Sequence, residues 1–268
     1  MNTTVSKDGT TIAYDRRGSG PALVLVDGAL CSRAQGPMPE LAELLADRFT
    51  VYNYDRRGRG DSGDASPGGS GRAGEASIDR ELEDLAAVIE VAGGSAYVYG
   101  TSSGAALALA AANAGLPIER VVAFETPFVV DGSRKPMPET FVADLEARGP
   151  ADAVKYFLTK GVGLPGPMVT LMRLMPAWKQ MTAVAHTLPY DGRFVAHNGL
   201  GRSLDAGQWS AVGVPVLTVI GGKSPAWMKN AVAAVTAAVP GAECREVPGQ
   251  NHMIAAKAIA PVIAGFCS

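Results

Sequence analysis

Short apolar runs alternate with amphipathic segments along most of the chain. Largely apolar runs, which are typical of strands buried on both faces, occupy residues 23–26, 51–54, 96–99, 120–124 and 215–220, and the first of them is continuous. Apolar residues recur at helical spacing in segments that lie between or after these runs, at 77–92, 103–114, 228–238 and in a last segment ending at Phe266. Two more strands are predicted at 11–15 and 243–247. This alternation predicts an α/β architecture with a mostly parallel sheet covered by helices on both faces.

The alternation is interrupted between residues 127 and 212. This segment is rich in Pro and Gly, and it contains the following large apolar residues: Met168, Met172, Met175, Met181, Trp178 and Trp209. We interpret 127–212 as a helical cap inserted at the carboxyl edge of the sheet, with 1–126 and 213–268 forming the core. A Gly/Ser-rich stretch at 66–74 is predicted to be a mobile loop.

Composition and charge limit the classes of function. The chain has 268 residues, 47% of them hydrophobic, which suffices for one sizeable core. Lys and Arg number 24 against 26 Asp and Glu, without a basic stripe, so nucleic acid is not an expected partner. No apolar stretch is long enough for a membrane span or a signal peptide, and membrane association is not expected either. The cysteines number three, an odd number, which favours a reducing, cytoplasmic location. They also lack metal-ligand spacing, so no bound metal is expected.

The pentapeptide Gly100-Thr101-Ser102-Ser103-Gly104 matches G-x-S-x-G. In a chain with 32 glycines such a match arises readily by chance, so its setting decides its meaning. It follows a predicted strand and leads directly into an Ala-rich predicted helix. A turn this tight strains the central residue and exposes its side chain above the sheet, at the positive end of the helix. We therefore predict Ser102 to be a nucleophile, the alternative being a capped Gly/Ser turn.

Acyl transfer requires backbone donors for the negative charge that develops on the carbonyl oxygen. The amide of Ser103 is one candidate, because Ser103 is the first residue of the predicted helix. The second donor is expected from Gly28 or Ala29, in the loop after the strand at 23–26. Two roles are open for Asp27 in this loop: it holds the loop by hydrogen bonds, or it contacts the substrate.

Three histidines are available as a general base: His186, His197 and His252. A serine nucleophile needs a base that titrates near neutral pH, and histidine is the usual one. His252 follows the last predicted strand and precedes the last predicted helix, which is where the base belongs in the chain order Ser, acid, His. The other two fall within the predicted cap. We therefore predict His252 as the base.

The chain departs from the commoner arrangement at the acid. Hydrolases with this strand–turn–helix motif usually carry an Asp after the strand predicted here at 215–220, but residues 221–225 contain no carboxylate. Ser224 cannot stabilise an imidazolium by charge, so the acid must lie elsewhere. Glu125 ends the neighbouring predicted strand, and its longer side chain helps it reach His252. A salt bridge to the first turn of the cap is its alternative role, and the rival acids are Asp131, Asp191 and Asp205.

With these motifs in order, the chain resembles the α/β-hydrolase superfamily over nearly its whole length, and in detail it resembles the zearalenone lactonases. The matching residues are Asp27-Gly28, the segment 100–105, Glu125, His252 and the missing Asp near Ser224. The resemblance implies an α/β-hydrolase fold and a Glu acid, which supports Glu125 independently. It also implies a cap tryptophan that contacts the lactone, at a place similar to that of Trp178.

The function expected from these residues is hydrolysis of a carboxylic ester or lactone through an acyl-enzyme, without a metal or organic cofactor. The partner is a medium-sized apolar small molecule, zearalenone-like lactones included, because Met and Trp provide adaptable and flat apolar surfaces. The predicted substrate-binding residues are Asp27, Leu30, Met175 and Trp178. The sequence leaves open whether the protein forms a homodimer. Three alternatives remain: a non-hydrolytic biosynthetic reaction (carbon–carbon cleavage, dehydration or cyclisation), a hydrolase-like ligand receptor, and cofactor-free haloperoxidase activity.

Overall fold

The computed structural model describes residues 1–65, 76–205 and 207–268 of the chain. The Gly/Ser-rich loop predicted at 66–74 lies outside the described residues. Within the described part of the chain, no helix combines the length and the apolar character needed to cross a membrane.

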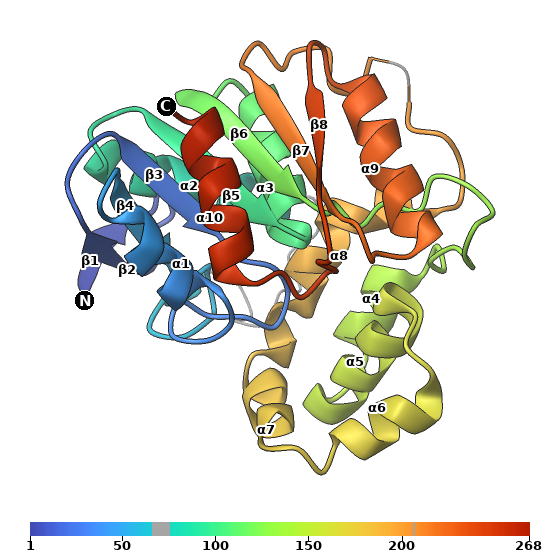
Figure 1. Ribbon diagram of the computed structural model, residues 1–268. Helices are drawn as coiled ribbons and strands as arrows, with labels where there is room; N and C mark the ends of the chain where they lie inside the picture. Colours follow the sequence, from blue (N-terminus) through green and yellow to red (C-terminus); the bar gives the residue numbers. More distant parts are fainter. Residues whose placement is uncertain (66–75, 206) are drawn as a thin grey trace.

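One eight-stranded sheet runs through the described residues, in the order β1-β2-β4-β3-β5-β6-β7-β8 (Figure 1). The strands are β1 (Asn2–Val5), β2 (Thr11–Arg17), β3 (Ala22–Val26), β4 (Thr50–Tyr54), β5 (Ala96–Thr101), β6 (Ile118–Phe124), β7 (Val216–Gly221) and β8 (Glu243–Val247). β2 pairs antiparallel with β1 and with β4, and the other neighbours are parallel. The predicted α/β architecture with a mostly parallel sheet is confirmed.

Alternate side chains of the central strands enter two different apolar layers, one on each face of the sheet. In β3, for example, Val24 packs into the first layer and Leu25 into the second. The helices of the first layer are α2 (Ala76–Val91), α3 (Ser103–Asn113) and α9 (Ala226–Ala238), and those of the second are α1 (Met38–Leu45) and α10 (Ala256–Phe266). Burial on both faces explains why these strands are largely apolar in the sequence.

The carboxyl ends of the four central parallel strands lie along one edge of the sheet. The register pairs Val26 of β3 with Gly100 of β5, Thr101 of β5 with Phe124 of β6, and Phe124 with Val219 of β7. The residues that directly follow these strands therefore emerge next to one another, although they are far apart in the sequence. This edge is the one at which ligands generally bind in open α/β sheets.

A group of short helices fills the interval between β6 and β7, and we refer to it as the cap. Its helical segments are α4 (Phe141–Glu146), α5 (Pro150–Tyr156), a π-helical turn (Phe157–Val162), α6 (Gly166–Met172), α7 (Pro176–Ala183), α8 (Leu188–Ala196) and two 3-10 turns (Ala185–Thr187 and His197–Gly199). In Figure 1, α6 and α7 lie at the end of the cap farthest from the sheet. α8, in contrast, packs against α2 and α3 of the core.

Outside the cap, the structure contains two elements that the sequence analysis does not predict. β1 is an edge strand of largely exposed residues, so it carries no apolar run. α1 buries Met38, Leu41 and Leu45 at helical spacing, but it is only eight residues long and begins beside a proline. The bounds of the other predicted strands and helices differ from the observed ones by at most two residues.

Candidate active site

Ser102 occupies the turn between β5 and α3. Its backbone has φ 56° and ψ −124°, a conformation that residues with a side chain rarely adopt. The neighbouring glycines permit close backbone packing: a Cβ on Gly100 would lie 2.3 Å from the carbonyl oxygen of Gly104. The Ser102 amide donates a 2.9 Å hydrogen bond to the carbonyl oxygen of Phe124, at the end of β6. The turn thus holds Ser102 in a strained position at the N-terminus of α3.

The loop after β3 passes directly beside Ser102. A Cβ on Gly28 would lie 3.1 Å from the Ser102 Cβ and 3.7 Å from its Oγ, so glycine lets the backbone approach the serine. The Gly28 amide donates a 2.8 Å hydrogen bond to Asp27 Oδ1. The amides of Ala29 and Ser103 donate to no protein oxygen among the described residues. Of the three predicted oxyanion donors, Gly28 is therefore engaged in this conformation, and the other two are available.

Asp27 is buried beside this turn. Burial raises the pKa of its carboxyl group to about 7, although the Gly28 amide acts in the opposite direction. The thiol of Cys31 is a further side-chain partner of this carboxyl group. The bond to Gly28 gives Asp27 a role in shaping the loop. Leu30, two residues after Gly28, has φ 62° and packs against the first apolar layer.

His252 and Glu125 are joined by a 2.8 Å hydrogen bond between Nδ1 and Oε2. Glu125 follows β6 with φ 48°, and its side chain is completely buried. Its other oxygen, Oε1, accepts hydrogen bonds from the Gly221 amide (2.8 Å) and from the Ser224 hydroxyl. Both carboxylate oxygens are therefore engaged, which fixes the orientation of the carboxylate toward the imidazole.

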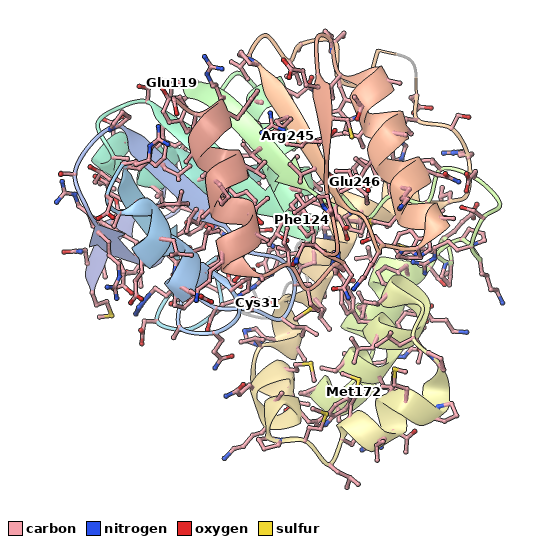
Figure 2. All side chains as sticks on the ribbon, in the orientation of Figure 1. Cys31, Glu119, Phe124, Met172, Arg245 and Glu246 are labelled. Atoms are coloured by element: carbon pink, nitrogen blue, oxygen red, sulfur yellow. The ribbon has the colours of Figure 1, made fainter. Side chains whose placement is uncertain are left out.

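The loop that carries His252 is held against the end of β7. The Lys223 amide donates a 2.8 Å hydrogen bond to the Gln250 carbonyl oxygen, and a Cβ on Gly221 would lie 2.6 Å from the same oxygen. The imidazole of His252 also stacks on the Phe124 ring, with centroids 6.3 Å apart and planes 20° from parallel. Phe124 is labelled in Figure 2 on the strand that ends next to Glu125. The His252 side chain is 38% exposed and so keeps an open face.

None of the rival acids contacts His252. In the part of the chain that the structure describes, Asp205 pairs with His197 at 3.3 Å on the surface, and Asp131 accepts a 2.7 Å hydrogen bond from Asn230. None of the hydrogen bonds of the described residues joins Asp131, Asp191 or Asp205 to His252. The structure thus brings Glu125, and not a cap aspartate, to the predicted base.

A buried charge cluster next to this site was not predicted from the sequence. Arg56, Arg57 and Arg59 follow β4, and each is at most 2% exposed. Arg56 donates to both oxygens of Glu81, with Nε 2.6 Å from Oε1, and Arg57 donates to both oxygens of Asp84. The sequence identifies the segment 55–63 only as a Gly-rich loop, which is normally exposed. Its counter-charges come from distant parts of the chain.

The structure separates two predicted substrate-binding residues from the nucleophile. Trp178 is buried inside the cap, with the Arg173 guanidinium 5.7 Å from its ring centroid, and Met175 is 54% exposed. Trp178 belongs to α7 and Met175 immediately precedes it, and α7 lies away from the sheet edge (Figure 1). Their contact with a substrate stays a prediction. Among the described residues, no three His, Cys, Asp or Glu side chains are arranged to hold a metal ion.

The chain is similar to solved structures and to a curated protein. The chain superimposes on an alpha/beta hydrolase from Sphaerobacter thermophilus with a TM-score of 0.88 and 46% identity, and the alignment covers 100% of both chains. It also superimposes on the enol-lactonase from Burkholderia xenovorans, with a TM-score of 0.69, 19% identity and 99% of each chain covered; at this identity the likeness shows the fold alone. An uncharacterized hydrolase of Bacillus subtilis, YraK, is 33% identical over 109 residues, which are 40% of this chain and 38% of that protein.

A model of the Alpha/beta hydrolase family matches residues 23–264. The match begins in β3 and ends in α10, so it includes the whole strand edge that carries Ser102, Glu125 and His252. The fold expected from the sequence is confirmed by this match and by the superposition on the Sphaerobacter structure. The chain belongs to the alpha/beta hydrolase family.

Proposed function

We propose that the protein is a serine hydrolase that opens a carboxylic ester or lactone through an acyl-enzyme, with Ser102, His252 and Glu125 as its triad. The observation that carries the proposal is the 2.8 Å bond between His252 Nδ1 and the completely buried carboxylate of Glu125. A carboxylate in this place fixes the tautomer that carries the proton on Nδ1 and leaves Nε2 free to accept one.

In the proposed reaction, His252 Nε2 takes the hydroxyl proton of Ser102 while Oγ attacks the carbonyl carbon of the substrate. The bond to the leaving oxygen then breaks, and the imidazolium returns the proton to that oxygen. In a lactone the released alcohol stays attached to the acyl group. A water molecule, deprotonated by His252, attacks the acyl-enzyme and releases the carboxylic acid and Ser102.

The negative oxygen of each tetrahedral intermediate requires donors that are already in place. The amides of Ser103 and Ala29 are the candidates, since the Gly28 amide is engaged with Asp27. Removal of one such donor typically costs about 3 kcal/mol of transition-state stabilisation. The position of Ser102 at the N-terminus of α3 adds the positive end of the helix to the same site.

The proposed substrate is a medium-sized apolar ester or lactone. The support for this class is the methionine-rich cap and the Glu acid shared with the zearalenone lactonases that the sequence resembles. The enol-lactonase from Burkholderia xenovorans is similar in fold. A zearalenone-like macrocyclic lactone is one member of this proposed class.

A panel of short-chain p-nitrophenyl esters and lactones of different ring size, zearalenone included, tests the proposal. Mass spectrometry should find ring-opened products heavier by one water, and p-nitrophenyl esters should give a pre-steady-state burst that is lost in Ser102→Ala. Lactone products that differ from the substrate by anything other than one added water would favour a non-hydrolytic reaction. Tight binding with very slow turnover would favour a receptor.

A further inference from the structure

The cap sends one buried carboxylate into the core beside the proposed active site. Asp191 lies on α8 and is buried. Its Oδ1 accepts hydrogen bonds from the Ser103 hydroxyl (2.6 Å) and from Arg56 Nη1 (2.7 Å), and its Oδ2 accepts one from Arg59 Nη2 (2.7 Å). Burial acts to raise the pKa of Asp191, but Arg59 and Arg56 outweigh it and hold that pKa below its usual value. Asp191 is thus an ionised group with a fixed orientation.

The two arginines extend from Asp191 to the loop after β3. Arg59 Nη1 donates a 2.7 Å hydrogen bond to the carbonyl oxygen of Gly28, and Arg56 Nη1 donates a 3.2 Å hydrogen bond to that of Asp27. The Gly28 carbonyl and the Ala29 amide belong to one planar, trans peptide unit, in which the C=O and N–H groups point in opposite directions. Fixing the Gly28 oxygen therefore fixes the direction of the Ala29 N–H.

The same carboxylate also holds the second proposed donor. The Ser103 hydroxyl that Asp191 binds belongs to the residue whose amide begins α3. Asp191 therefore restrains both oxyanion donors, Ser103 directly and Ala29 through Arg59. The charges of these ion pairs balance. Arg56 pairs with both Glu81 and Asp191, and Arg59 pairs with Asp191, so two guanidinium groups are matched by two carboxylates.

We infer that Asp191 is a positioning residue that couples the cap to the oxyanion hole, through its hydrogen bonds to Ser103, Arg56 and Arg59. The inference rests on the proposed function, since it assigns a role within the proposed acyl-transfer site. It predicts that the placement of α8 governs how well the site stabilises a tetrahedral intermediate, while binding of the planar substrate depends on other contacts. Removing the carboxylate charge should lower kcat and leave KM nearly unchanged.

Asp191→Asn tests the inference, with a trifluoromethyl ketone as a probe that forms a tetrahedral adduct on the nucleophile. Asparagine keeps the size of the side chain but leaves Arg59 and Arg56 without its charge. We expect kcat/KM and the affinity for the ketone to fall together by about 10-fold to 100-fold, because the donors are misplaced rather than removed. KM and the binding of a planar product acid should stay within about twofold of the wild type.

The matched control is Glu146→Gln, which removes the carboxylate charge from a different ion pair, between Glu146 of α4 and Arg193 of α8. Glu146 accepts a 2.6 Å hydrogen bond from Arg193 and is not part of the Asp191 network. This variant should keep wild-type values of both affinities. If Asp191→Asn binds the ketone as tightly as the wild type does, or if it weakens ketone and product acid equally, the inference is wrong.

Ser103→Ala decides the question if Asp191→Asn fails to fold, which circular dichroism and thermal unfolding will show. It removes only the hydroxyl that Asp191 holds and keeps the backbone amide. We expect ketone affinity to fall at least about threefold with KM unchanged, and an unchanged ketone affinity overturns the inference. Failure of the proposed function itself has a different signature, because the wild type would then bind the ketone no better than Ser102→Ala does.

Discussion

Ser224 donates a hydrogen bond to Oε1 of Glu125 from the loop after β7, where the commoner hydrolase arrangement carries the acid itself. The hydroxyl at this position therefore supports a carboxylate that enters from the neighbouring strand. Oε2 of the same glutamate remains directed at His252, at 2.8 Å. The missing Asp and the presence of Glu125 are thus two aspects of one arrangement.

Glu125→Gln should lower kcat by about 10³-fold to 10⁴-fold, as the loss of a triad acid does in a serine protease. The amide cannot stabilise the imidazolium and permits the wrong tautomer of His252. Steady-state kinetics on the best ester of the panel provides the measurement. Glu119→Gln is the matched control, because Glu119 is exposed near the beginning of β6, the strand that Glu125 directly follows (Figure 2). Near wild-type turnover in Glu125→Gln would refute the assignment of the acid.

Ser224→Ala should reduce both stability and turnover moderately. Oε1 of Glu125 keeps only the Gly221 amide as a partner, and a hydrogen bond to a charged group contributes about 1.5–3 kcal/mol. We expect a loss of this size in the free energy of unfolding, measured with urea, and a decrease in kcat of about threefold to tenfold. Ser210→Ala, at an exposed position, serves as the control. Equal stability of the two variants would mean that Ser224 does not support the acid.

Gly28→Ala should impair activity more than stability. The added Cβ would lie 3.1 Å from the Ser102 Cβ and 3.7 Å from Oγ, in the space that a substrate carbonyl must enter. We expect kcat/KM to fall by at least about tenfold. Gly265→Ala provides the comparison, because a Cβ there meets no atom within 4 Å. If Gly28→Ala keeps full activity, the loop after β3 does not border the reacting carbonyl.

Asp27→Asn should change how stability depends on pH. The pKa of Asp27 is raised from 3.8 to about 7 in the folded protein, mainly by burial, so ionisation of this group opposes folding. Its favourable contribution is complete below about pH 4 and is lost as the pH rises to about 7, at about 1.4 kcal/mol per pH unit. The Asn variant avoids this loss and should gain stability relative to the wild type as the pH rises.

Urea unfolding of both proteins at pH 5 and at pH 8 measures this difference. The advantage of Asp27→Asn should be larger at pH 8 than at pH 5. Asp8→Asn should instead lose the same amount of stability at pH 5 and at pH 8, because the pKa of Asp8 is lowered to about 2 and its charge stabilises the fold at both pH values. A pH-independent difference between Asp27→Asn and the wild type would show that the Asp27 pKa is not raised.

Much of the fold follows from the sequence because the central strands are buried on both faces. β3 and β5 carry largely apolar runs, and the motif around Ser102 joins a strand to a helix as the structure shows. β1 is not predictable in this way, since an exposed edge strand has no apolar pattern. The ends of strands also fix the places of Ser102, Glu125 and His252, so these three could be proposed before any coordinates.

The buried charges could not be predicted from local pattern. Arg56 and Arg59 lie in a Gly-rich segment of the kind that is usually exposed, and their partner Asp191 is 135 and 132 residues away in the sequence. Only the packing of α8 against the core brings these groups together. The orientation of the cap helices is a tertiary property for the same reason, and the sequence alone does not reveal that α7 projects away from the sheet edge (Figure 1).

The central claim is that Ser102 is the nucleophile, and a fluorophosphonate probe tests it most directly. Intact-protein mass spectrometry followed by peptide mapping should find one phosphonate on the wild-type protein, attached to Ser102, and none on Ser102→Ala. The rate of labelling should fall in Glu125→Gln in parallel with kcat. Labelling of a different serine, or equal labelling of the wild type and Ser102→Ala, would contradict the account.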